Sequence, residues 1–301
     1  MLDQILEMID FSKLNIADYI PEIVFAVVCL VIVYFLIINF RDINRFVVRE
    51  YYFCATGLKK NTKMVVITDL HNKQYGRNNQ VLWNAIELIA PDYILIAGDM
   101  ITNGRYDNTP ACELLRMLSS KYPVYYANGN HETKLKLNAE QLGQVAYDYE
   151  KSVSELPLKW LRNENDYIKD INLHIYGLDL EWAYYKRFRK KPLPPGYLKE
   201  KLGEPDRNRV NLLIAHNPEY FEEYAEWGAD LVVSGHMHGG IIRLPLLGGV
   251  LSPRYTLFPE YDGGLYHKGK STLILSRGTG THILPLRIFN PGELVVVHMR
   301  H

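Results

Sequence analysis

Residues 64–71 read MVVITDLH, in which a short apolar, β-prone run passes directly into Asp69 and His71. Residues 93–99 repeat the arrangement as YILIAGD and end on Asp99. A short, nearly continuous apolar run is typical of a strand that is buried on both faces, as in a parallel sheet covered by helices. The carboxyl ends of parallel strands meet at one edge of the sheet, where ligands bind. The two stretches therefore predict an α/β fold with polar side chains collected at that edge.

Runs of the same kind recur along the chain. Strands are expected at 64–68, 93–97, 124–127, 171–176, 210–215, 231–234, 272–276 and 294–298. Amphipathic helical patterns lie between several of them, at 81–89, 112–118 and 218–227. The alternation predicts a largely parallel sheet early in the chain. The later strands are joined by Gly- and Pro-rich segments with few helices, which favours a second, more antiparallel sheet.

A long apolar segment precedes this pattern. Residues 23–38 carry no charge, and the segment extended to 20–40 has 21 residues, enough at about 1.5 Å per residue to cross a hydrocarbon core of about 30 Å. A buried core helix seldom lacks a polar stripe over this length, and a signal peptide usually starts with basic residues, whereas this flank is acidic. We therefore predict an N-terminal flank (1–19), one transmembrane anchor (20–40), a juxtamembrane linker (41–62) and one folded domain (63–301).

Basic residues are distributed unevenly around this segment. Before it stands only Lys13; after it come Arg41, Arg45, Arg49, Lys59 and Lys60. The positive-inside rule then keeps the C-terminal side in the cytoplasm. We expect a single-pass protein of the cell membrane whose large domain is cytoplasmic.

The overall composition excludes several other classes of protein. Lys and Arg together number 34, as do Asp and Glu, so the chain lacks the basic balance typical of a nucleic-acid-binding domain and no nucleic-acid partner is expected. An apolar content of 48% is too high for a disordered chain. The three cysteines, an odd number without metal-finger spacing, argue against a disulfide framework.

Residue types that bind metals follow five of the expected strands. They are Asp69 and His71, then Asp99, then Asn130 and His131, then His216, and finally His236 and His238. Side chains two residues apart in a strand project to the same side, so each closely spaced pair can face one centre. A single Asp-x-His or His-x-His pair is more often structural, but the ordered set at one sheet edge predicts a metal centre. His174 and His298 lie inside strands without such neighbours and are expected to be structural.

Taken together, these motifs resemble those of the calcineurin-like metallophosphoesterase superfamily. They are Asp69-x-His71, Gly98-Asp99, Gly129-Asn130-His131-Glu132, His216 and Gly235-His236-Met237-His238. The resemblance covers residues 64–297. The stretches 234–245, 276–278 and 285–287 are similar to the membrane-associated bacterial phosphodiesterase branch of that superfamily. The resemblance implies a four-layer α/β/β/α metallophosphoesterase sandwich over residues 63–301, preceded by the transmembrane helix.

The resemblance also implies a site with two divalent metal ions bridged by Asp99. Asp69, His71 and His238 would complete one metal position, and Asn130, His216 and His236 the other. His131 would be the catalytic residue that faces the scissile bond without binding metal. A mixture of imidazole, carboxylate and amide ligands suits Mn²⁺, Fe or Zn²⁺ better than Ca²⁺.

The activity implied is hydrolysis of phosphodiester or pyrophosphate bonds by metal-activated hydroxide. With the anchor, the expected substrate is a phospholipid, a lipid-linked nucleotide or another envelope intermediate. The alternatives are a phosphomonoesterase acting on a small molecule or a protein, and an inactive scaffold, which is disfavoured because no ligand position is missing. Ala127 stands where Ser/Thr protein phosphatases place an arginine, which disfavours the protein substrate.

Two features have no settled role in the sequence. Asn103 stands where many relatives carry a second acidic residue, so it supplies no charge to orient His131. No residue is assigned to substrate, because Arg243, Arg254 and Arg277 are equally explained as phosphate ligands or as surface ion pairs. Residues 184–201 mix basic and aromatic side chains, which fits either a solvated loop or a flap that touches acidic lipid headgroups or a phosphorylated substrate.

Overall fold

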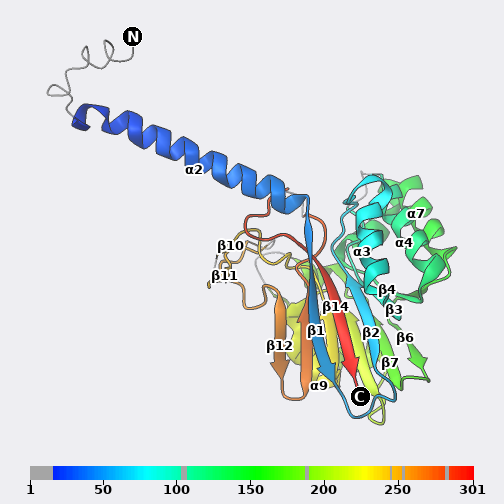
Figure 1. Ribbon diagram of the computed structural model, residues 1–301. Coiled ribbons are helices and arrows are strands. Elements are labelled where there is room, and N and C mark those ends of the chain that lie inside the picture. The colour runs from blue at the N-terminus through cyan, green and yellow to red at the C-terminus, as the bar shows by residue number, and fades with distance from the viewer. Residues whose placement is uncertain (1–15, 103–106, 187–189, 245, 253–254, 282–284) are drawn as a thin grey trace.

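Two six-stranded sheets lie face to face, and helices cover their outer faces, in a computed structural model of the chain (Figure 1). The structure describes residues 16–102, 107–186, 190–244, 246–252, 255–281 and 285–301. The predicted four-layer α/β/β/α fold, with one apolar N-terminal helix, is confirmed.

The first sheet is mainly parallel. Its spatial order is β1 (Phe46–Cys54), β14 (Gly292–Arg300), β2 (Thr62–Ile67), β3 (Tyr93–Ala97), β4 (Val124–Ala127) and β5 (Lys159–Leu161). Strands β2 to β5 run parallel, with Val65 opposite Ile94, and β14 runs antiparallel to β2.

The second sheet is antiparallel only at its two edges. Its order is β12 (Gly264–Lys268), β13 (Ser271–Leu275), β9 (Leu231–Ser234), β8 (Val210–Ala215), β7 (Leu173–Leu178) and β6 (Glu164–Ile168). The four inner strands are parallel, so the expected antiparallel character is confined to β12 and β6.

Helices complete the outer layers. The first sheet is covered by α3 (Gln80–Ile89), α4 (Thr109–Lys121) and α7 (Gln144–Ser154), and the second by α8 (Tyr197–Leu202) and α9 (Phe221–Trp227). In β2, Val65 and Ile67 pack under the first group of helices, while Met64 and Val66 pack against the second sheet. Burial of both faces explains why the strand runs show no alternation of apolar and polar residues.

Residues 41–62 are not a linker, contrary to the prediction. Strand β1 within them pairs in parallel with β14 along its whole length, from Phe46 opposite Gly292 to Cys54 opposite Arg300. The sequence hid this strand because it lies at a sheet edge and much of it, including Arg49 and Glu50, is exposed. The folded domain therefore begins almost directly after the apolar helix.

Helix α2 (Ile20–Ile43) projects from the domain and ends three residues later than expected (Figure 1). Its mean hydropathy is 3.0, and it is the one helix among the described residues that is long and apolar enough to cross a membrane. The C-terminal end of the helix is bonded to the domain. The buried Asp42 carboxylate accepts a hydrogen bond from Asn290 N at 2.9 Å, and Asn39 Oδ1 accepts one from Arg287 N at 2.7 Å.

The interpretation of residues 184–201 as a surface flap is wrong for its tyrosines. Tyr184, Tyr185 and Tyr197 are buried in the core between the second sheet and α8 and α9. Lys191 Nζ lies over the ring of Tyr184, 4.8 Å from its centroid, so part of the basic charge covers this core rather than a ligand. Residues 187–189 lie outside the described residues.

Candidate metal centre

The residues of the predicted site come from both sheets. Asp69 and His71 follow β2, Asp99 follows β3, and His131 lies in the first turn of α5 (Asn130–Leu137), just after β4. His216 follows β8, and His236 and His238 follow β9. The carboxyl ends of the inner strands thus gather all eight predicted site residues, including Asn130, at one edge of the sandwich.

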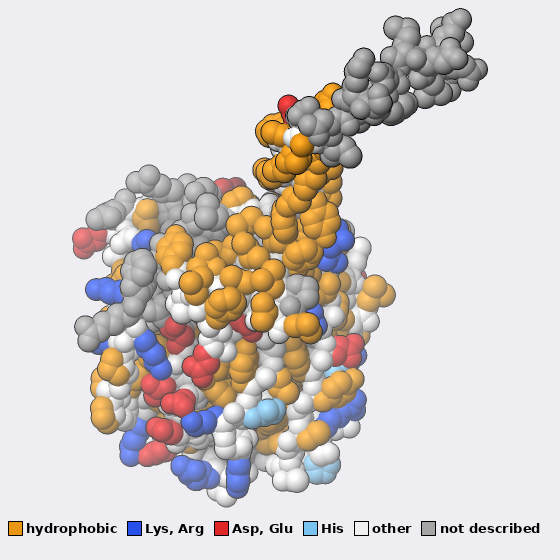
Figure 2. Space-filling model, turned by 90° about the vertical axis from the view of Figure 1, so that its left-hand side faces the viewer, with side chains coloured by type: hydrophobic (Ala, Val, Ile, Leu, Met, Phe, Trp, Pro, Cys, Tyr) orange, Lys and Arg blue, Asp and Glu red, His pale blue; other side chains and the backbone are white. Residues whose placement is uncertain are grey.

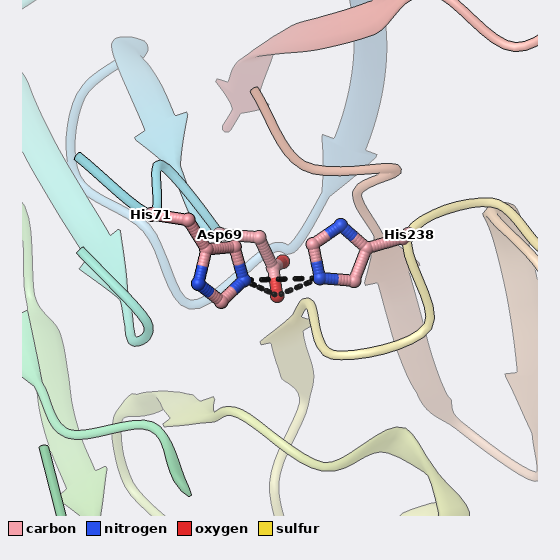
Figure 3. Close-up of side chains that lie close together, drawn as sticks. All are labelled: Asp69, His71 and His238. Atoms are coloured by element: carbon pink, nitrogen blue, oxygen red, sulfur yellow. Dashed lines mark hydrogen bonds and ion pairs between the residues drawn. The ribbon is translucent and has the colours of Figure 1, made fainter. Parts of the chain in front are cut away.

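One group of potential ligands comprises Asp69, His71 and His238 (Figure 3). Asp69 Oδ1 lies 3.3 Å from His238 Nε2 and 3.9 Å from His71 Nε2. The two Nε2 atoms are 3.1 Å apart. Two ring nitrogens and a carboxylate oxygen therefore converge on one small volume from two loops, the one after β2 and the one after β9.

A second group comprises Asp99, His216 and His236, whose potential ligand atoms all lie within 4.8 Å of one another. Asp99 Oδ2 lies 3.1 Å from His216 Nε2 and 3.9 Å from His71 Nε2, so this carboxylate stands between the two groups. Asn130 Oδ1 is buried and accepts no hydrogen bond from any described residue. A buried acceptor left in this state is costly unless something else satisfies it.

The buried carboxylates of the site favour the binding of cations. Asp69 and Asp99 are both buried. Burial raises the pKa of Asp69, whereas the pKa of Asp99 is well below its usual range because His216, His131 and His71 outweigh the same effect of burial. Positive charge from the imidazoles thus stabilises the carboxylates here, a role that metal ions take over when they displace protons. The nitrogen and oxygen donors fit a binuclear site for divalent transition metals.

Backbone carbonyls fix the orientation of two of these histidines. Nδ1 of His216 donates to Ala97 O at 2.6 Å, and Nδ1 of His71 donates to Ile101 O at 3.2 Å. Each bond places the proton on Nδ1 and leaves Nε2 facing the centre, as metal-binding histidines require. Asp69 is held by a side chain instead, since Thr68 Oγ1 donates to its Oδ2 at 2.7 Å.

The site is built on left-handed backbone, which the sequence analysis missed. Five site residues have positive φ: Asp69 (51°), His71 (49°), Asp99 (54°), His236 (74°) and His238 (50°). They lie beyond the strand ends, so the closely spaced pairs converge through tight turns and not through alternation along a strand. Non-glycine residues in this region carry a conformational cost that the surrounding structure must offset, and such residues cluster at functional sites.

Two glycines allow the loops to approach the carboxylates. A Cβ atom at Gly129 would overlap the Asp99 side chain, and one at Gly235 would overlap Thr68 and Asp69. Neither glycine needs a left-handed backbone. Because they lack a side chain, both glycines let their own backbone lie directly against the site carboxylates.

His131 lies beside the centre. Its Nε2 is 3.9 Å from Asp99 Oδ2, and its ring meets the ring of His71 edge to face, with centroids 4.7 Å apart. Its backbone N donates to Asp99 Oδ1 at 2.7 Å, and burial lowers the pKa of its imidazole. Asn103, considered above as an orienting residue, lies outside the described residues.

Glu132 is a positioning residue that sequence reasoning left without a role. Its buried carboxylate accepts hydrogen bonds at 2.8 Å from the backbone N atoms of Asp99, Met100 and Gly129. One side chain thus ties the loop after β3 to the loop after β4. Burial, reinforced by the charge of Asp99, raises its pKa. The only signal in the sequence was its place at the end of the Gly129–Glu132 motif.

We expect Glu132→Gln to destabilise the protein and weaken the metal site. The amide keeps one acceptor oxygen but turns an NH₂ group toward backbone N–H donors, which should lower the free energy of unfolding by about 3 kcal/mol. Metal affinity should fall roughly 10- to 100-fold, as for other supporting residues. Thermal unfolding in detergent and metal titration measure the two effects. The exposed Glu155→Gln is the matched control, and equal behaviour of the two variants would contradict the role of Glu132.

The arginines considered as phosphate ligands are held by carboxylates. Arg277 Nε lies 3.2 Å from Glu293 Oε2, and Arg243 Nη1 lies 3.1 Å from Asp262 Oδ2. Arg254 lies outside the described residues. These pairs favour a structural role, and no residue is assigned to substrate.

Comparison with known proteins gives a consistent picture. Residues 62–240 match the family model described as calcineurin-like phosphoesterase. An uncharacterized metallophosphoesterase of Campylobacter jejuni is 29% identical over 81% of this chain and 60% of its own length. The phosphodiesterase YaeI of Escherichia coli is 26% identical over 73% of this chain and 75% of its own. A zebrafish transmembrane protein with a metallophosphoesterase domain is 22% identical over 79% of this chain and 53% of its own. The chain thus spans about 60% of the Campylobacter relative.

Proposed function

This chain belongs to the calcineurin-like phosphoesterase family of metal-dependent hydrolases, and on that basis we propose that it is a membrane-anchored phosphodiesterase or pyrophosphatase. Its substrate would be a phospholipid, a lipid-linked nucleotide or another envelope intermediate. We place it in the membrane-associated bacterial branch of the family, with Mn²⁺, Fe or Zn²⁺ in the site.

Asp69, His71 and His238 would hold one ion, Asn130, His216 and His236 the other, and Asp99 both. When bound, a pair of divalent ions activates water and neutralises charge on phosphoryl oxygens. His131, which has no ligand role in this assignment, would donate a hydrogen bond to the leaving oxygen as negative charge builds there.

The observation that supports the membrane part of the proposal is the bonding of α2 to the loop after β9 that carries His236 and His238, here called the metal loop. Asn290 bonds to both parts: its backbone N donates to Asp42 Oδ2 at 2.9 Å, and its Nδ2 donates to His238 O at 2.7 Å. One residue therefore joins the end of the apolar helix to a predicted metal ligand. An anchor attached in this way holds the site close to the membrane surface.

Two further features support the proposal. The zebrafish relative is named as a transmembrane protein, and the Escherichia coli relative as a phosphodiesterase. Basic residues after α2, among them Arg41 and Arg45, favour a cytoplasmic domain under the positive-inside rule.

The test uses the full chain, purified in detergent and supplied with Mn²⁺. We expect kcat/KM for an aryl phosphodiester to exceed that for the matching monoester by about tenfold or more, because distinct contacts around the phosphorus discriminate such substrates. The reverse preference would favour the phosphomonoesterase alternative.

Flotation of the protein with liposomes tests the anchor separately, and recovery in the unbound fraction would contradict it.

A further inference from the structure

An exposed apolar surface lies beside the metal loop. It consists of Leu244, Leu246, Leu247, Tyr255, Leu257 and Phe258, here called the apolar rim. Leu246 is fully exposed, and the exposed fractions of Leu257 and Phe258 are 65% and 59%. Figure 2 shows hydrophobic side chains continuing from the projecting helix onto the adjoining face of the domain, with basic side chains beside the foot of the helix and most acidic side chains of this face farther from it. Contiguous exposed apolar patches of this kind mark interaction sites.

The rim is continuous with α2 through a chain of contacts. Its first part is a hairpin formed by β10 (Arg243–Leu244) and β11 (Gly248–Gly249), which lies near the foot of α2 in Figure 1. Just before this hairpin, Ile242 forms a parallel bridge with Ile288. The next residue, Phe289, packs against α2, its ring centroid 6.4 Å from that of Tyr34 and 6.3 Å from that of Phe35.

These contacts place Phe289, in the segment paired with the residue before the hairpin, at the level of a bilayer. If residues 20–40 cross the membrane, Phe35 lies five residues inside the end of the span, or about 7.5 Å along the helix axis. Phe289 packs at that level, so the segment that carries it runs beside the part of the helix that would lie inside the bilayer. The apolar rim is attached to this segment and exposes leucine and aromatic side chains, the residue types that bury in the interface.

The rim is also continuous with the metal loop. Arg243 Nη1 donates to Gly239 O at 2.7 Å, and Ile241 N donates to Leu251 O at 2.7 Å. Only Gly239 to Ile242 separate His238 from the hairpin. Insertion of the rim would therefore fix the height and tilt of the metal loop above the lipid.

We propose that the apolar rim inserts into the bilayer that α2 crosses, as a second membrane contact that turns the metal centre toward lipid headgroups. The proposal rests on the proposed function, whose substrate it narrows to the phosphodiester or pyrophosphate of a lipid that stays in the membrane during hydrolysis. A water-soluble ester would need no such contact.

The first test measures depth. The full chain, with Cys29→Ser, Cys54→Ser and Cys112→Ala, carries a fluorescent probe at Leu246→Cys or at Leu88→Cys in phospholipid nanodiscs. Leu88 is 88% exposed but lies near the C-terminal end of α3, which returns to the start of β3 at the opposite edge of the sheet. We expect spin-labelled lipid to quench the probe at 246 and not at 88. Quenching at neither position, with both probes open to aqueous iodide, would overturn the proposal.

The second test measures turnover with Leu246→Glu and the matched Leu88→Glu. We expect Leu246→Glu to lower kcat/KM for a phosphodiester lipid in nanodiscs by about tenfold, since a charge replaces a side chain that partitions into the interface. Turnover of a soluble aryl phosphodiester should be unchanged in both variants. Equal losses on the two substrates, or no loss on the lipid, would contradict the membrane role. Absence of turnover by the parent protein would instead refute the proposed function, and the depth measurement would still decide the position of the rim.

Discussion

Asp99→Asn is expected to abolish turnover by emptying the metal centre. Asp99 Oδ2 is the carboxylate oxygen shared by the two ligand groups, 3.1 Å from His216 Nε2 and 3.9 Å from His71 Nε2. The amide removes one negative charge from a buried site and leaves a weaker ligand between two cations. Since metal ions supply several kcal/mol of transition-state stabilisation, we expect kcat to fall about a thousandfold or more.

Metal analysis of the purified full chain, together with turnover of the aryl phosphodiester, measures this result. The parent protein should bind two ions and Asp99→Asn fewer than one. Asp170→Asn replaces an exposed aspartate and should change neither quantity. An Asp99→Asn variant that kept both ions and parental turnover would show that Asp99 does not bridge the site.

The inner strands and the order of the site residues were predictable because both have strong local signals. A strand buried on both faces, such as β3, must be apolar throughout, and its carboxyl end must meet those of its parallel neighbours. Edge strands carry no such constraint. β6 reads ENDYI and β12 reads GLYHK, and both pass for loops because one side of each faces solvent.

The local shape of the site was not predictable from the sequence. The residue types of Asp69 and His71 do not indicate that both adopt a left-handed backbone conformation. That conformation is imposed by hydrogen bonds such as Asp69 N to Gly98 O and His71 N to Asp99 O. The role of Glu132 depends in the same way on donors more than thirty residues away. Long-range hydrogen bonds of this kind have no signature in a single sequence.

The aromatic residues around position 184 illustrate a different limit of prediction from composition. Tyrosines mixed with lysines fit an exposed flap as well as a covered core, and composition does not separate the two. The fold decides, because Tyr184 and Tyr197, the latter in the first turn of α8, are both buried in the core over the second sheet.

His131→Ala should separate catalysis from metal binding. His131 lies beside Asp99 without belonging to either predicted ligand set, so its loss should leave two ions in place while kcat falls by about 10²- to 10⁴-fold, the usual contribution of a positioned acid or base. Its backbone N–H bond to Asp99 Oδ1 does not depend on the side chain and survives the substitution. His174→Ala is the matched control, since His174 hydrogen-bonds Asn165 and Tyr176 on the second sheet.

The leaving group provides the decisive readout. If His131 stabilises charge on the departing oxygen, the loss of rate must be large for an alkyl leaving group and small for a nitrophenolate, which needs little help to depart. A purely structural histidine would lower both rates by the same factor. Equal losses on the two substrates, or the loss of metal from His131→Ala, would therefore remove His131 from the catalytic step and make it a ligand or a packing residue.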